Sequence, residues 1–125
     1  SRAMSRIFES SFGSVYPLYL AKVARKGRSQ AELDQVIEWL TGYGQAELAQ
    51  HLERGTTFRE FFAQASIHPN VDLITGSICG VKIQEIEDPL MKQIRYLDKL
   101  VDELARGRAM EKVLRGTSVG VTSES

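Results

Sequence analysis

The sequence has only one cysteine and no long apolar run, and each of these features narrows the class of protein. Cys79 has no second cysteine to pair with, whereas secreted proteins carry cysteines mostly in pairs, so we expect a cytoplasmic protein. No stretch approaches the roughly 18 consecutive apolar residues that a membrane-spanning helix needs. Residues 1–3 lack the apolar core of a signal peptide and read as a cloning remnant ahead of Met4.

An excess of charge is also missing, since 16 basic and 16 acidic side chains give a formal net charge of zero. Nucleic-acid binding draws most of its affinity from basic residues that neutralise phosphates. We therefore expect no nucleic-acid partner and no membrane partner. Two local basic runs, within residues 22–28 and 106–115, keep a nucleic-acid or membrane-surface binder as the weakest alternative.

The common catalytic and cofactor motifs are absent as well: no GxGxxG, P-loop, HExxH or GxSxG pattern occurs. We therefore expect no cofactor and favour a non-catalytic protein. A zinc site normally needs three or four ligands at recognisable spacing. His51, which we place on a polar helix surface, and His68, which precedes a proline in a turn, do not supply such a pattern, so we expect no metal site.

What is present is typical of one globular domain. The chain has 125 residues, of which 42% are hydrophobic and 26% charged, enough to bury a core without disulfide bonds. No internal repeat or linker divides it. We expect a single helical domain over residues 4–115 and a mobile tail, rich in Gly, Ser and Thr, over residues 116–125.

Apolar periodicity and capping signals predict four helices in the first half of this domain. The first spans residues 14–26 and the second begins with a Ser–Glu capping box. A third covers residues 45–54, and a Thr–Glu capping box opens the fourth. The residues predicted to start or stop these helices are Ser14, Gly27, Ser29, Glu32, Gly42, Gly55, Thr57 and Glu60.

Residues 71–86 change character, since β-branched residues in partial alternation predict a short β-hairpin that turns near Gly76. A long helix follows, with Asp88 as N-cap and Pro89 in its first position. Gly107 ends it, and a short final helix covers residues 109–114. The expected fold is thus mainly α: an irregular orthogonal bundle of five or six helices with one small β-hairpin. The long helix presents one apolar face: Leu90, Ile94, Leu97, Val101 and Leu104.

Cys79 is the first of four residues that we consider for a pocket or interface. A nucleophilic thiol needs a pKa lowered by a nearby base or helix N-terminus. The favoured alternative is a small buried apolar residue, because its neighbours Ile78 and Gly80 form no motif.

The other three candidates lie at the long helix. Asp88, with Glu85 and Glu87, forms a carboxylate cluster of the kind that splits into acid and base roles, although a helix cap is the simpler reading. Arg95 and Tyr96 belong to residue types enriched in interface hot spots. A solvated, salt-bridged helix face is the alternative for these two.

Several segments together resemble a known family: residues 11–19, 39–43 and 78–81, and the long stretch over residues 86–100. They are similar to the small bacterial proteins catalogued as "domain of unknown function 2200", over about residues 5–115. The resemblance implies a mainly α-helical bacterial protein. It implies no activity and no site residue.

Three classes of function follow, in order of preference. The first is a non-catalytic protein that acts through protein interaction or self-association as a homodimer, using residual apolar surface, because the long helix has too few heptads for a free-standing coiled coil. The second is a small-molecule-binding protein or enzyme with a pocket near Cys79, Asp88 and Arg95. The third is the basic-surface binder mentioned above.

Overall fold

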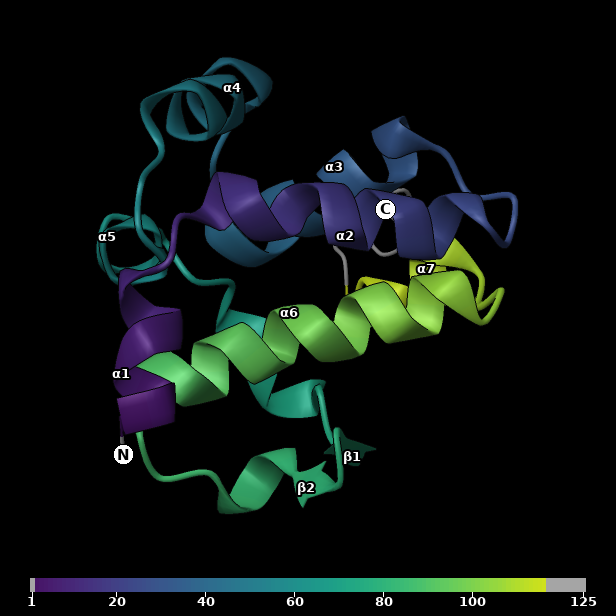
Figure 1. Ribbon diagram of the computed structural model, residues 1–125. Helices are drawn as coiled ribbons and strands as arrows, with labels where there is room; N and C mark the ends of the chain where they lie inside the picture. The colour runs from purple at the N-terminus through teal and green to yellow at the C-terminus, as the bar shows by residue number, and fades with distance from the viewer. Residues whose placement is uncertain (1, 117–125) are drawn as a thin grey trace.

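The fold is mainly helical, as the computed structural model of residues 2–116 shows, with side chains described from Arg6 onward (Figure 1). These residues form seven α-helices, two short 3-10 helices and one antiparallel two-stranded hairpin. The mainly α class with one small hairpin is therefore confirmed. The elements are α1 (Arg2–Glu9), α2 (Phe12–Ala24), α3 (Gln30–Thr41), α4 (Gln45–Arg54), α5 (Phe58–Ala63), η1 (Pro69–Leu73), β1 (Ser77–Ile78), β2 (Val81–Lys82), η2 (Ile83–Glu85), α6 (Pro89–Ala105) and α7 (Met110–Val113).

The two ends of the chain differ in how far the structure describes them. Arg2 and Ala3, which we expected to be a cloning remnant, form the start of α1, a helix that lies ahead of the first predicted one. The tail expected over residues 116–125 lies outside the described residues, except for Gly116. Within the described part, no helix combines the length and the apolar character that crossing a membrane requires.

The start and end of α3 follow the predicted local signals. The Ser29 hydroxyl accepts a hydrogen bond from the Glu32 amide at 3.1 Å, and the Glu32 carboxylate accepts one from the Ser29 amide at 3.0 Å. Both halves of the capping box are therefore formed. Gly42 ends the helix with φ of 76°, a left-handed conformation that costs glycine little.

The N-cap of α2 is Ser11 and not Ser14, which corrects the prediction. The Ser11 hydroxyl accepts a hydrogen bond from the Ser14 amide at 3.1 Å, so the N-cap lies three residues earlier than expected. The cause is tertiary: the Phe12 amide donates to the Thr56 carbonyl at 2.8 Å, and this pairing holds Ser11 in an extended conformation. No pattern near Ser11 reveals that it pairs with Thr57, 46 residues later in the chain.

The hairpin is shorter than predicted and turns elsewhere. Ile78 pairs with Val81, so the turn consists of Cys79 and Gly80, not of residues near Gly76. Both turn residues have positive φ, 54° and 78°, as a two-residue hairpin turn of this hand requires. Residues 71–73, which were expected to be strand, belong instead to the 3-10 helix η1 (Pro69–Leu73).

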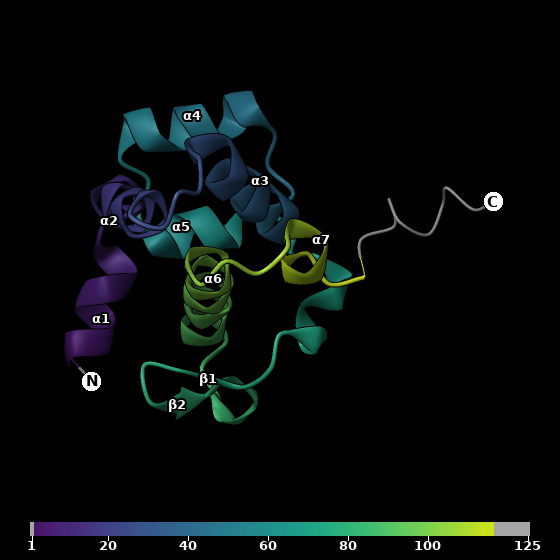
Figure 2. The ribbon, with the colours of Figure 1, turned by 90° about the vertical axis from the view of Figure 1, so that its right-hand side faces the viewer.

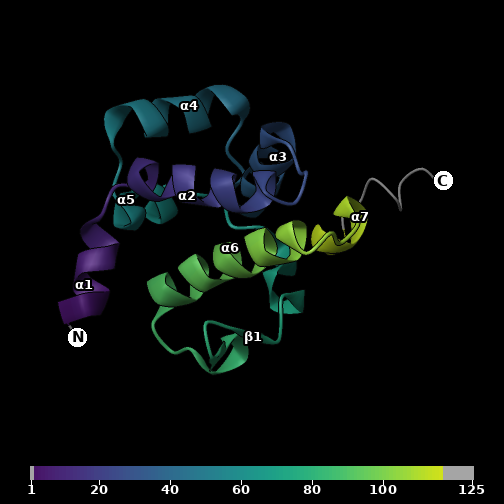
Figure 3. The ribbon, with the colours of Figure 1, turned by 45° about the vertical axis from the view of Figure 1, so that its right-hand side comes forward.

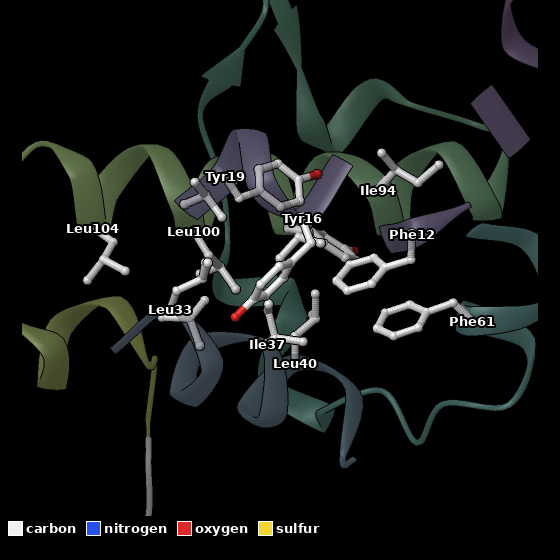
Figure 4. Close-up of a cluster of buried hydrophobic side chains, with 14 of the residues drawn as sticks. Phe12, Tyr16, Tyr19, Leu33, Ile37, Leu40, Phe61, Ile94, Leu100 and Leu104 are labelled. Carbon is white, nitrogen blue, oxygen red and sulfur yellow. The ribbon is translucent and has the colours of Figure 1, made fainter. Parts of the chain in front are cut away.

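The core lies between α6 and the helices packed on one side of it. Figure 2 shows α6 almost end-on, with α2, α3 and α5 above it and the hairpin below. The rings of Phe12 and Phe61 stack with centroids 4.0 Å apart (Figure 4). On α6, Leu97, Leu100 and Leu104 are fully buried. The apolar face of α6 is thus used inside its own domain, and a dimer needs a different surface.

Candidate functional site

The start and one side of α6 account for two of the four candidate residues. Asp88 is exposed, and its carboxylate accepts the Met91 amide at 2.9 Å, so it acts as the N-cap. Tyr96 is only 5% exposed and points into the protein. Burial, followed by the charge of Asp72, raises the pKa of Tyr96 above its usual range. Both residues therefore have clear structural roles.

Arg95 lies in a polar cluster on the outer side of α6. Its guanidinium donates to Asp98 at 2.9 Å, and the Tyr19 hydroxyl donates to the other oxygen of the same carboxylate at 2.7 Å. Tyr19 is buried on α2, so burial first and the Asp98 charge second hold its pKa well above the usual range. Its hydroxyl therefore stays protonated at neutral pH and ties α2 to α6.

This cluster closes one end of a small groove of about 270 Å³ between α1, α2 and α6. The side chains along the groove are mostly apolar and include Val15 of α2 and Met91 of α6. Leu18, one turn after Val15, is 66% exposed. The lining residues are Ile7, Val15, Tyr19, Phe58, Met91, Ile94, Arg95 and Asp98.

A second and larger cleft, of about 710 Å³, lies between the hairpin and the C-terminal half of α6. Figure 3 shows α6 running between α2 and the hairpin. Cys79 lines the cleft and is exposed, so the expectation of a buried cysteine is wrong. The reason is its place in the turn, where a side chain projects away from the core. The lining residues are Ser77, Ile78, Cys79, Gly80, Lys99, Asp102, Glu103, Arg106 and Arg108.

Two carboxylates organise the charges of this larger cleft. The Asp102 carboxylate accepts hydrogen bonds from the Lys22 ammonium at 3.2 Å and from the Arg106 guanidinium at 2.9 Å. Glu103 is buried, and Arg115 donates to both of its oxygens at 2.6 Å. The Arg108 guanidinium approaches Glu103 at 3.1 Å, and the Lys99 ammonium donates to the Ser77 carbonyl at 3.2 Å.

The groove and the cleft adjoin each other along α6. Asp98 borders the groove and Asp102 the cleft, and residues four apart lie one turn apart on the same helix face. Arg95 borders the groove beside Asp98, and Cys79 borders the cleft beside Asp102. The structure thus brings Cys79 and Arg95 to one side of α6, while Asp88 caps the helix start and Tyr96 lies inside.

Several side chains of this surface were absent from the sequence-based candidates. Tyr19 and Lys22 come from α2 and contact Asp98 and Asp102, about 80 positions later in the chain. A local motif search does not detect such pairs. The available signal was compositional: polar side chains on the outer face of a long helix and a tyrosine on the apolar face of another.

Both histidines contact aromatic rings. His51 was expected on a polar surface, but it is buried, and its Nδ1 lies 2.9 Å from the Thr56 hydroxyl. His68 stacks on Trp39 with ring centroids 4.2 Å apart. Within the described residues, no three His, Cys, Asp or Glu side chains are grouped so that they would hold a metal ion.

The fold and site define a small, mainly α-helical protein with a groove and a cleft on its central helix. The family model described as "Uncharacterized protein conserved in bacteria (DUF2200)" matches residues 6–115, so the chain belongs to this family. A crystal structure titled "uncharacterized protein SP1917" is similar, with a TM-score of 0.82 and 46% sequence identity, over 87% of this chain and 90% of that one. No curated protein matches the chain significantly.

Proposed function

We propose that this protein is a non-catalytic interaction protein that self-associates as a homodimer through the exposed face of α2. The observation that carries the proposal is the position of Leu18, which is 66% exposed and lies on α2 between Val15 and Tyr19, two residues that line the apolar groove. A single exposed leucine is ordinary on a protein surface. A leucine next to a groove that would accept an apolar side chain is a more specific feature.

The symmetry of homodimers supports this surface. In a two-fold dimer, the same patch meets itself, so it must contain both a protruding group and a hollow that receives it. Leu18 protrudes, and the groove begins one turn away at Val15. At about 270 Å³ the groove lies just below the usual range of small-molecule pockets, roughly 300–1,000 Å³, and is better suited to a side chain.

A non-catalytic role is supported by the environments of Asp88 and Tyr19. Asp88 is engaged as a helix cap, and the raised pKa of Tyr19 makes its hydroxyl a poor base at neutral pH. We further propose that the protein acts in the cytoplasm as a single domain over residues 4–115. The exposed, unpaired thiol of Cys79 supports a reducing compartment.

The substitution Leu18→Glu tests this proposal. We expect it to weaken dimerisation at least about tenfold, because a carboxylate buried in an apolar groove loses its hydration. Leu73→Glu, at another exposed leucine, is the matched control and should leave the dimer intact. Sedimentation equilibrium measures both, and circular dichroism checks that each variant is folded. Equal dimerisation of the two variants would rule out this surface.

Small-molecule binding is the second candidate function, and the cleft of about 710 Å³ beside Cys79 favours it. Its volume lies within the usual range of ligand pockets. The polar lining identifies the class of ligand that it would take.

A further inference from the structure

The cleft beside Cys79 concentrates positive charge, although the whole chain is neutral. Its two carboxylates, Asp102 and Glu103, face five cations that either line the cleft or form ion pairs with those carboxylates. The lining alone has three cations and two carboxylates, and the two cations that pair with these carboxylates from outside the lining raise the local surplus to three positive charges. The five cations are Lys22, Lys99, Arg106, Arg108 and Arg115.

The C-terminal end of α6 does not account for these cations. Arg28 already caps it, since its guanidinium donates to the Leu104 carbonyl at 3.1 Å and to the Arg108 carbonyl at 2.9 Å. Arg28 itself pairs with Glu32 at 3.1 Å and so adds no net charge. The dipole of a helix end is equivalent to about half a negative charge, much less than the local surplus.

The ion pairs with Asp102 and Glu103 leave part of the Arg106 and Arg108 guanidinium groups available to bind a ligand. Glu103 is held on both oxygens by Arg115, so the contact from Arg108 is additional. The side chains of Arg106 and Arg108 remain 78% and 44% exposed. Their ion pairs fix one edge of each guanidinium, and the remaining N–H groups are accessible from the cleft. Such pre-positioned guanidinium groups suit doubly charged oxyanions.

We propose that this cleft binds a small phosphate-bearing molecule, with Arg106 and Arg108 as the main contacts and Lys99 contributing charge. A phosphate group matches the surplus better than a single carboxylate does, because it carries up to two negative charges and three acceptor oxygens. This proposal goes beyond self-association and concerns different residues, so an experiment that contradicts one of the two proposals leaves the other unaffected. Cys79 has no chemical role here and serves as a reporter at the edge of the cleft.

The single cysteine allows a direct measurement of ligand binding and of local charge. Uncharged dithiodipyridine reports access to Cys79, and added pyrophosphate should slow this reaction in a saturable way, while sodium chloride of equal ionic strength should not. Anionic dithionitrobenzoate reports the local potential. Relative to a free thiol, we expect its rate, normalised to that of dithiodipyridine, to be raised about tenfold at low salt, because a cationic cleft concentrates anions.

The variant that tests the residues is Arg106→Ser with Arg108→Ser, in which Arg115 still pairs with Glu103. We expect the protection by pyrophosphate and the enhanced rate of the anionic reagent to be lost together. Arg25→Ser removes an exposed cation from the C-cap of α2, outside the cleft, and should change neither result. Absence of saturable protection in the wild-type protein would overturn the proposal, as would equal protection in the double variant.

Discussion

Glu103 is the buried charge that fixes the C-terminal end of the described chain. Its carboxylate accepts two hydrogen bonds of 2.6 Å from Arg115, whose side chain is only 12% exposed. Arg115 also donates to the Leu73 carbonyl at 3.3 Å. One ion pair therefore connects α6, the segment after α7 and η1.

Replacing this carboxylate should destabilise the protein strongly. We expect Glu103→Ala to lower the free energy of unfolding by about 3 kcal/mol, because it leaves the largely buried Arg115 guanidinium without a carboxylate partner. Glu111→Ala, at an exposed position on α7, should change it by less than about 0.5 kcal/mol. Urea denaturation measures both. Equal effects would mean that the ion pair contributes little.

His51 makes stability depend on pH. Burial first, and the positive charge of Arg54 second, lower the pKa of His51 below its usual value of 6.5. The unfolded state therefore binds a proton more readily than the folded one, and stability is lost as the pH falls below about 6.5. We expect Tm to drop between pH 7 and pH 5, and to drop less in His51→Gln. The remaining slope would come from His68, whose pKa burial also lowers. An identical slope in the variant would contradict this role.

Side-chain hydrogen bonds cap the starts of several helices, and the cap of α6 is the simplest one to test. Asp88→Ala removes the acceptor of the Met91 amide and should lower the free energy of unfolding by about 1 kcal/mol. Glu87→Ala, next to it and also exposed, should have a much smaller effect. Chemical denaturation of the two variants compares them. A larger loss in the Glu87 variant would contradict the assignment of the cap.

Local signals predicted the elements well where a few neighbouring residues decide the outcome. The capping box of Ser29 and Glu32 and the Asp88–Pro89 start of α6 depend only on residues within one turn. Ser11 became the cap of α2 through pairing with residues 56–58, which no local pattern reveals. The hairpin turn was also missed, because one of its two residues with positive φ is Cys79, and residues other than glycine seldom adopt this conformation.

The candidate site was harder to predict than the elements. Arg95 and Cys79 were chosen by residue type, and the structure places both on the same side of α6. Their partners come from distant segments: Tyr19 reaches Asp98, and hairpin and helix meet where Lys99 donates to Ser77. Such convergence depends on how the helices pack, and periodicity within one segment does not encode it.

At the scale of the whole molecule, α6 is the helix shared by the core, the apolar groove and the cationic cleft. α6 packs against α2, α3 and α5 in the core, the apolar groove lies where α6 meets α1 and α2, and the cationic cleft lies where α6 meets the hairpin. Opposite charges balance over the chain, yet they are unevenly distributed over its surface. Our two proposals use these features separately: a second copy of the chain in the groove and an anionic ligand in the cleft.

The mass of the wild-type protein in solution tests the central claim of self-association most directly. Size-exclusion chromatography with light scattering should give twice the chain mass of 14.0 kDa at high micromolar concentration and a lower mass on dilution. A mass of 14.0 kDa at every concentration would contradict the account, because Leu18 and the groove would then have no second copy to bind.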